Sequence, residues 1–213
     1  MAANPPAIAP SDRMGRPPST ALPFTAGALR CVELAASDVP ALQRFFEENP
    51  AYFESVTGRG PAADEAQQEF SDVPPSGMPF RRKWMLGFVD ERSDLRAMAN
   101  VLEDFLAPTV WHIGLFIVAS SLHGRGVASI AYERLEAWMA ANGARWVRLG
   151  VVAGNARAER FWQRAGYRET RRRRDVVMGE RVNTVVVMVK GLAANAPVSE
   201  YLAIVARDRP ESP

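Results

Sequence analysis

The sequence predicts a mixed α/β fold in which one central sheet carries helices on both faces. Three observations support this. Short strand-like runs and amphipathic helical segments succeed one another along residues 28–192. A strand-helix-strand-helix succession within residues 109–165 requires parallel strands joined by right-handed crossovers. Strand-like runs within residues 83–105 and 167–190 are joined by short turns and are therefore antiparallel. Parallel and antiparallel strands together make a mixed sheet between helical layers.

The first part of the chain is predicted to hold a strand, three short helices and a hairpin. Residues 28–34 alternate apolar and polar side chains, as a half-buried strand does. Ser37 or Asp38 then caps a helix that stops at Asn49-Pro50, because the residue before proline avoids helical backbone angles. The predicted elements are a strand at 28–34, helices at 37–48, 51–56 and 63–70, and strands at 83–90 and 96–105.

The second part begins with a third consecutive strand and then alternates helix and strand. Val127, Ala131, Leu135 and Trp138 form one apolar stripe, which predicts an amphipathic helix ended by Gly143. The predicted elements are a strand at 109–119, a helix at 127–141, a strand at 146–152, a helix at 155–165, and hairpin strands at 167–177 and 182–190.

The chain is expected to form one domain between two tails. Its 213 residues are 47% hydrophobic and 23% charged, which is enough apolar material for a sizeable core. Residues 1–27 are rich in proline and small side chains and are predicted to be a flexible tail. Residues 28–192 form the predicted domain, and residues 193–213 a second tail, within which residues 201–206 can form a short helix.

The composition argues against several classes of protein. A formal net charge of +2 is too small by itself to indicate nucleic-acid binding. Cys31 is the sole cysteine, so no internal disulfide can form, as is typical of a reducing compartment. The N-terminus lacks a signal-peptide pattern and no apolar run approaches a membrane span, so a cytoplasmic protein is expected. Two histidines without ligand spacing predict no metal site.

The loop from His123 to Ala128 is the most informative segment of the chain. It reads His-Gly-Arg-Gly-Val-Ala and joins an apolar strand to a helix. Gly124 and Gly126 allow the backbone to approach a ligand closely. The helix that follows offers unpaired N–H groups and a partial positive charge at its N-terminus. This combination predicts a phosphate-binding site.

Downstream, Asn155 is followed by Ala158-x-x-Phe161-Trp162-x-x-x-Gly166-Tyr167. The glycine loop, this second segment and the strand order together resemble the GNAT superfamily of acetyl-CoA-dependent N-acetyltransferases, over residues 29–192. The resemblance implies the order β-α-α-β-β-β-α-β-α-β-β, with splayed parallel strands 4 and 5, and acetyl-CoA as co-substrate without a metal. The pantetheine arm is expected to pair with the fourth strand, and the amide of Val118 to bind the oxyanion. The expected cofactor-binding residues are Phe116, Ile117, Val118, His123, Gly124, Arg125, Gly126, Val127, Ala128, Asn155 and Trp162.

The sequence departs from the family pattern at two of these positions. His123 stands where Arg or Gln is usual. Asn155 does not depart from the pattern, but it can serve as a helix cap as well as a cofactor ligand. Trp162 stands where the family often carries a Tyr that protonates the departing thiolate, and an indole N–H has no useful acidity. Tyr167 is one substitute for that acid, while water or direct loss of the thiolate are others.

For the general base, His112 is the first candidate because its ordinary pKa lies near neutral pH. Strand alternation predicts His112, Gly114, Phe116 and Val118 on one face. A purely structural histidine fits the sequence equally well. Glu103, near the end of the preceding strand, is the alternative base.

The acceptor side is predicted to involve Tyr52, Phe53, Glu54 and Arg59, although helix packing accounts for each of them singly. The overall prediction is an N-acetyltransferase that acts on a primary amine of a small molecule by direct attack, with a homodimer as an assembly common in the family. A non-catalytic acyl-CoA-binding module and an acetyltransferase of protein amines are alternatives. The run Arg171 to Arg174 could suggest nucleic acid, but its acidic neighbours indicate a solvated hairpin strand.

Overall fold

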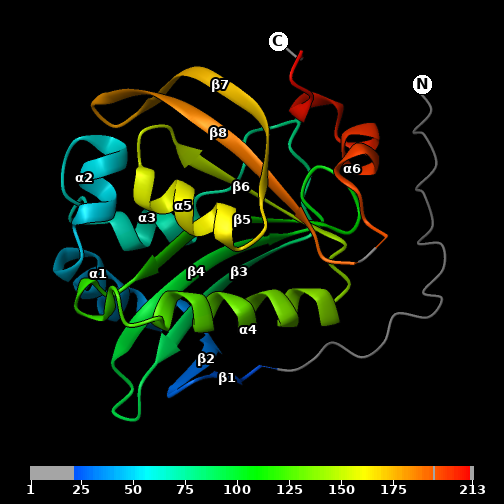
Figure 1. Ribbon diagram of the computed structural model, residues 1–213. Helices are drawn as coiled ribbons and strands as arrows, with labels where there is room; N and C mark the ends of the chain where they lie inside the picture. The colour runs from blue at the N-terminus through cyan, green and yellow to red at the C-terminus, as the bar shows by residue number, and fades with distance from the viewer. Residues whose placement is uncertain (1–21, 194, 212–213) are drawn as a thin grey trace, which may run out of the picture.

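The computed structural model describes residues 22–193 and 195–211, which form an eight-stranded mixed sheet flanked by helices (Figure 1). The strand order is β1-β2-β3-β4-β5-β6-β8-β7. The strands are β1 (Phe24–Ala26), β2 (Leu29–Glu33), β3 (Arg82–Val89), β4 (Leu95–Glu103), β5 (Val110–Val118), β6 (Trp146–Val152), β7 (Arg168–Met178) and β8 (Arg181–Gly191). The helices are α1 (Val39–Glu48), α2 (Ala51–Thr57), α3 (Glu65–Ser71), α4 (Val127–Ala141), α5 (Ala156–Arg164) and α6 (Val198–Ile204).

The only parallel neighbours in the described sheet are β5 and β6, which are the predicted fourth and fifth strands because β1 was not predicted. They separate partway along their length, which confirms the predicted splay. They are paired from Val110 opposite Trp146 to Ile113 opposite Leu149. Beyond that point β5 stays paired with β4, and β6 stays paired with β8. The carboxyl ends of two neighbouring parallel strands therefore face a gap, where backbone N–H and C=O groups of β5 are free to bind a ligand.

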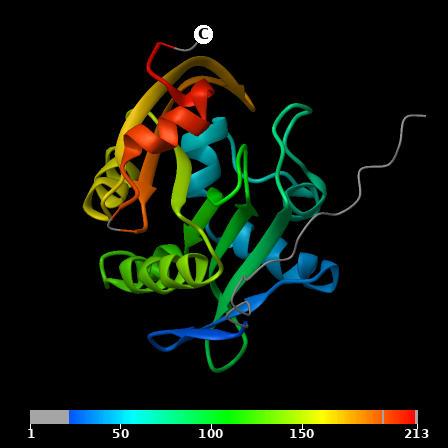
Figure 2. The same cartoon turned by 90° about the vertical axis from the view of Figure 1, so that its right-hand side faces the viewer.

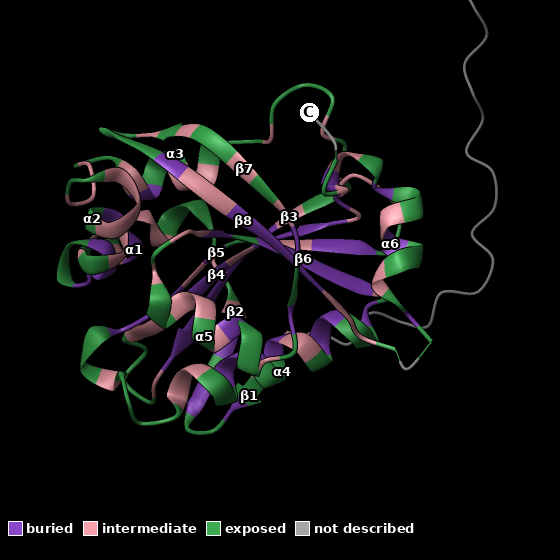
Figure 3. Cartoon of the chain, turned by 45° about the horizontal axis from the view of Figure 1, so that its top comes forward, coloured by how far each residue is buried: buried purple, intermediate pink, exposed green. Residues whose placement is uncertain are grey.

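Two helical layers cover the sheet, and each has its own apolar cluster. Leu42 and Phe46 of α1 pack with Met98 and Leu115 on one face. On the other face, α4 buries a larger cluster around Trp138, and α5 packs against the same cluster. Figure 2 shows α4 and α1 on opposite sides of the strands, and Figure 3 shows burial concentrated in the middle strands. The gap between β5 and β6 thus opens between two rigid layers.

A β-bulge at Gly114 changes which side chains of β5 share a face. Asn100 is opposite Leu115 while Val101 is opposite Ile113, so Gly114 has no partner on β4. Phe116 consequently packs in the α4 cluster together with Ile113, and the predicted shared face of His112 with Phe116 and Val118 is wrong. The inserted residue breaks the two-residue period on which the prediction depended.

The structure orders more of both ends of the domain than the sequence predicted. Phe24–Ala26, assigned to the tail, forms β1 against β2, and Phe24 contacts the rings of Phe88 and Trp138 at 6.2 and 6.1 Å. Residues 1–21 of that predicted tail lie outside the described residues. At the other end α6 and a following turn pack on the sheet, with Tyr201 and Asp208 only 0% and 1% exposed. β1 is too short for a periodic signal, whereas α6 overlaps the short helix that the sequence allowed at residues 201–206.

None of the described helices is long and apolar enough to cross a membrane.

Candidate functional site

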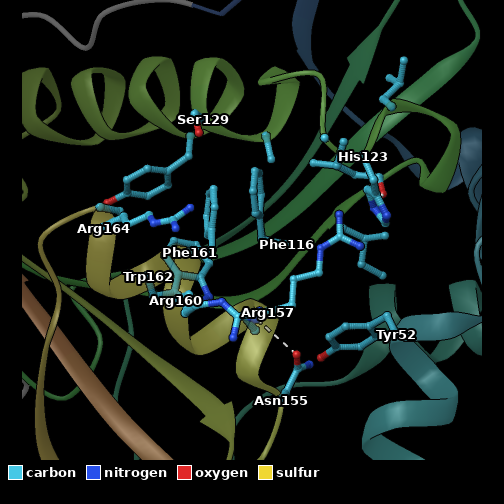
Figure 4. A pocket seen from close by; sticks show the side chains of 18 of the residues that line it. Tyr52, Phe116, His123, Ser129, Asn155, Arg157, Arg160, Phe161, Trp162 and Arg164 are labelled. Carbon is cyan, nitrogen blue, oxygen red and sulfur yellow. Dashed lines mark hydrogen bonds between the residues drawn. The ribbon is translucent and has the colours of Figure 1, made fainter.

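A groove of about 850 Å³ runs from the glycine loop to α5 and α2 (Figure 4). The end of β5 and the start of α4 form one wall, and α5 forms the other. Nine of the eleven predicted cofactor-binding residues line the groove, among them Phe116, Ile117, Val118 and Asn155. The side chains of Arg125 and Val127 are not part of the described lining.

The glycine loop has the geometry of an anion cradle. Gly124 and Gly126 have φ angles of 76° and 77°, in the left-handed region that favours glycine. Gly126 is the N-cap of α4 and no side chain caps this helix, so the first-turn N–H groups are left for a ligand or water. A Cβ at either glycine would meet nothing within 4 Å. The loop therefore has both the donors and the open space that a pyrophosphate needs.

His123 is held by the end of β5. Its Nε2 lies 2.9 Å from the carbonyl oxygen of Val118, so Nε2–H donates to that oxygen. The ring also lines the groove, next to the loop glycines. The bond fixes the loop relative to β5, and contact between His123 and a phosphate stays a prediction.

Asn155 is the N-cap of α5, which is one of the two roles that the sequence predicted for it. Its Oδ1 accepts a hydrogen bond of 3.1 Å from the N–H of Ala158. The side chain also lines the groove, where Figure 4 shows it facing Tyr52. The cap uses the carbonyl oxygen, so the Nδ2 donor is left for a ligand.

Trp162 is a buried wall of the site. It is 7% exposed, and its ring lies 5.8 Å from Phe116, 5.1 Å from Tyr132 and 5.2 Å from Tyr167, measured between ring centroids. Such an aromatic group gives the groove a rigid apolar side.

Three arginines of α5 were missed by the sequence analysis. Arg157, Arg160 and Arg164 all line the groove, and Figure 4 shows them on the side of α5 that faces it. Their spacing of three and four residues places them on one face of a helix, which was the available signal. Such a cationic row suits the phosphates of a nucleotide cofactor.

A second cavity, of about 290 Å³, lies on the other side of the gap between β5 and β6. Side chains of α2, β7 and β8 complete its walls. It shares five lining residues with the groove: Tyr52, Phe116, Asn155, Ala158 and Trp162. A molecule in the second cavity could therefore reach a molecule in the groove at this junction.

His112 lines the second cavity, but its environment suppresses protonation. Its ring stacks on Phe105 at 4.7 Å, and its Nδ1 lies 3.1 Å from the carbonyl oxygen of Arg148. Burial, and then the charge of the Arg148 guanidinium, lower the pKa of His112 to about 3. The expected pKa near neutral pH is therefore wrong, because the sequence did not place an arginine beside the ring. His112 is neutral at physiological pH and is a weak base.

This lowered pKa predicts a pH dependence of stability. An unfolded histidine binds a proton below about pH 6.5, whereas His112 in the folded protein does not until about pH 3. The free energy of unfolding should therefore fall as pH drops from 6.5 towards 3, by up to about 5 kcal/mol from this residue. We expect urea titrations of His112→Asn to show a shallower acid loss than wild type, and equal acid slopes would contradict the pKa.

The other predicted catalytic residues lie outside both cavities. Glu103 is buried, where it accepts hydrogen bonds from Arg81 at 3.1 Å and from the indole of Trp84 at 3.2 Å. Tyr167 is 3% exposed and its hydroxyl pairs with that of Tyr132 at 2.9 Å. Burial raises the pKa of Tyr167. Neither side chain lines a described cavity, so the geometry favours structural roles for both.

Of the predicted acceptor residues, Tyr52 is the one that the structure brings to the junction. Phe53 packs in the α1 cluster against Phe46 at 4.9 Å, while Glu54 and Arg59 are exposed. None of these three lines either described cavity. Burial, and then the carboxylate of Glu69, raise the pKa of Tyr52, so its hydroxyl stays protonated.

Glu69 of α3 was not found from the sequence. Its Oε1 accepts a hydrogen bond from Asn100 Nδ2, and burial raises the pKa of its carboxyl group.

Among the described residues, no group of three or more His, Cys, Asp or Glu side chains could hold a metal ion.

Comparison with known proteins agrees with this geometry. Residues 42–167 match the model of the acetyltransferase (GNAT) family. Among solved structures, a GCN5-related N-acetyltransferase from Kribbella flavida is 23% identical with a TM-score of 0.58, over 78% of this chain and 99% of its own. An acetyltransferase from Thermus thermophilus is 21% identical with a TM-score of 0.58, over 79% of this chain and 99% of its own.

A spermidine N-acetyltransferase from Vibrio cholerae, solved with CoA and spermine, has a TM-score of 0.61 at 14% identity, over 78% of this chain and 96% of its own. At these identities the structural likeness is one of fold. No curated protein matches the sequence significantly.

Proposed function

Because the chain belongs to the GNAT acetyltransferase family, we propose that it is an N-acetyltransferase that moves an acetyl group from acetyl-CoA to a primary amine of a small molecule. The observation that carries the proposal is the junction of the two cavities at the gap between β5 and β6. One cavity has the anion cradle of a nucleotide cofactor. The other is small and lies where an acceptor would meet it.

The groove fits coenzyme A in its donors and its charge. The N–H groups at the start of α4 would hold the pyrophosphate, and the arginines of α5 would lie near the phosphates. The free backbone of β5 in the gap would pair with the amides of the pantetheine arm. Acetyl-CoA supplies the thioester, and every other role belongs to residues of the chain.

In the proposed reaction the amine nitrogen bonds to the thioester carbon and the carbon–sulfur bond breaks. The products are an amide and the CoA thiol, with the proton lost by nitrogen balanced by the one gained by sulfur. The amide of Val118 suits the oxyanion. The N–H of Ala119 donates to Arg96 on β4 at 2.9 Å, so the preceding N–H of Val118 points into the gap.

Tyr52 is the proposed hydrogen-bond donor to the departing sulfur. Among the five residues that line both cavities it carries the one hydroxyl group, and it lies across the junction from Asn155 (Figure 4). Trp162, where the family often has a tyrosine, has no hydroxyl to offer. A hydroxyl from α2 would thus replace one from α5.

The choice of a small acceptor rests on the small volume of the second cavity, about 290 Å³. Its outer wall is formed by α2 and the β7–β8 hairpin, where the Thr57 carbonyl accepts from Glu180 N–H at 2.8 Å and the Val56 carbonyl accepts from Asn183 at 2.8 Å. The Vibrio cholerae neighbour acts on a small polyamine, which is compatible with an acceptor of this size.

The direct test is release of free thiol from acetyl-CoA across a panel of amines, with the acetylated acceptor identified by mass spectrometry. We expect saturable release that requires an amine of low molecular weight. Saturable acetyl-CoA binding without release from any amine would indicate a non-catalytic module instead. Release with peptide amines alone would indicate an acetyltransferase of protein amines.

Gly126→Ala is expected to weaken acetyl-CoA binding at least about 10-fold, because the new Cβ would occupy the anion cradle. A left-handed non-glycine residue also costs roughly 1–2 kcal/mol of stability. The matched control is Gly77→Ala, since Gly77 has a similar φ of 86° and open space but does not line the groove. Isothermal titration with acetyl-CoA checks this, and equal affinity in the two variants would argue against phosphate binding at the loop.

A further inference from the structure

None of the described residues that line the second cavity carries a carboxylate, although the formal net charge of the chain is only +2. The charged side chains of this lining are Arg148 of β6 and Arg173 of β7. His112, neutral at physiological pH, adds no charge. The electrostatic character of the cavity therefore depends on how far the two arginines are neutralised.

The guanidinium group of Arg148 forms an ion pair with the carboxylate of Asp208. Its Nε lies 2.6 Å from Oδ2 of Asp208 and its Nη2 lies 3.2 Å from Oδ1, which is a bidentate pair. Both side chains are buried, and Tyr201 donates a further hydrogen bond to the same carboxylate. This pair contributes no net charge to the cavity.

The side chain of Arg173, by contrast, makes no hydrogen bond or ion pair with any residue that the structure describes. Three other guanidinium groups act on it, those of Arg207, Arg148 and Arg171, against the single carboxylate of Asp208. Burial and these like charges lower its pKa. The second cavity thus holds one uncompensated positive charge.

A bulge at Thr170 decides which face of β7 Arg173 occupies. Glu169 is opposite Met188 and Arg171 is opposite Val187, so Thr170 is an extra residue on β7. Arg173 is therefore opposite Val185, and both residues line the cavity, while Arg174 is exposed. Bulges that re-aim a side chain in this way are frequent beside active sites.

We propose that Arg173 binds an anionic group of the acceptor, so that the amine acetylated in this site belongs to a small molecule that also carries a carboxylate or phosphonate, as an amino acid does. The proposal rests on the proposed function, whose acceptor it specifies. The cavity volume of about 290 Å³ suits a molecule of about ten non-hydrogen atoms. A guanidinium group presents parallel N–H donors that match a carboxylate or phosphonate in two hydrogen bonds.

The same charge selects against other amines. A polyamine would bring a second cation next to Arg173, with no acidic side chain in the described lining to compensate it. Like charges that are brought together in this way reduce affinity and so contribute to specificity. The anionic end of an amino acid would instead be fixed at Arg173, with its amine free to reach the junction at Tyr52.

The test compares matched acceptors in the thiol-release assay: an amino acid, its carboxamide, its aminophosphonate analogue, the corresponding amine without the acidic group, and spermidine. We expect kcat/KM to be at least about 10-fold higher for the acidic compounds, which is the range of a charged hydrogen bond. The carboxylate and phosphonate arms show which anion fits. A preference for the carboxamide or for spermidine would overturn the proposal and leave the acetyltransferase function intact.

Arg173→Gln should lower kcat/KM for the acidic acceptors at least about 10-fold, mainly through KM, and leave the carboxamide unaffected. Arg174→Gln is the matched control, because Arg174 is the exposed neighbour on the same strand. An equal loss for all acceptors in Arg173→Gln would assign Arg173 a structural role and overturn the proposal.

Equilibrium binding separates this inference from the proposed function. If no amine releases thiol, titration of the amino acid and its carboxamide into wild type and Arg173→Gln still decides the question. Binding of the acidic compound that Arg173→Gln abolishes would support the anion site without acetyl transfer. Equal binding of both compounds, or of neither, would refute it.

Discussion

Tyr52→Phe is expected to lower kcat about 100-fold, with little change in KM for acetyl-CoA. The hydroxyl lies at the junction of the two cavities, and its raised pKa keeps the O–H available as a donor. Removal of one donor aimed at a charge that develops in the transition state costs about 10²–10³ in rate. The measurement is steady-state thiol release at saturating acceptor, with the melting temperature as a check on folding.

Tyr167→Phe tests the competing assignment. Tyr167 lies near Trp162 in sequence and in space, but it lines neither described cavity, and its hydroxyl is bonded to Tyr132, which does line the groove. We expect this variant to keep kcat within about 3-fold of wild type. If Tyr167→Phe loses turnover while Tyr52→Phe retains it, the donor is Tyr167 and not the hydroxyl at the cavity junction.

Asp208→Ala is expected to cost about 3–5 kcal/mol of unfolding free energy, the largest stability effect among the variants considered. It would leave the guanidinium of Arg148 buried, 8% exposed, without its bidentate partner. Urea denaturation measures the loss. The matched control is Glu200→Ala, whose ion pair with Arg145 also attaches the C-terminal segment but is exposed, so its removal should cost under about 1 kcal/mol.

The same pair predicts acid sensitivity. Burial opposes ionisation of Asp208, but hydrogen bonds from Arg148 prevail and lower the pKa of its carboxyl group. An aspartate with a lowered pKa stabilises the fold above its unfolded pKa, and that stability is lost as pH falls through the folded pKa. Asp208→Ala should remove this loss from the pH profile. Equal costs for Asp208→Ala and Glu200→Ala at neutral pH would show that the buried pair does not hold the C-terminal segment.

Much of the fold and half of the site followed from local patterns. The helix predicted at 127–141 and the strand at 146–152 have the bounds observed for α4 and β6. The glycines of the loop were predicted to let the backbone approach a ligand closely, and a Cβ at either of them would meet nothing within 4 Å. These features depend on periodicity and on single-residue conformational freedom, which act over a few neighbouring residues.

The acceptor side could not be derived in this way. Arg173 reaches the second cavity because a bulge in β7 shifts the alternation of the strand. Another bulge, at Gly114, places His112 on the opposite face of β5 from Phe116 and Val118. The low pKa of His112 comes from Arg148, 36 residues away, which Asp208 holds in turn from 60 residues further along the chain. No local pattern encodes such contacts.

The sequence by itself determined the order of elements, the phosphate-binding loop and the resemblance to the GNAT family, because these depend on neighbours along the chain. The tertiary structure alone decided which side chains meet at the gap between β5 and β6. Tyr52 of α2 lies at the junction of the two cavities, whereas Glu103 and Tyr167 line neither described cavity. Arg173 is the uncompensated charge in the lining of the second cavity. The physical reason is that burial, charge pairing and strand register are set by segments far apart in sequence, and the chemistry of the acceptor site depends on all three.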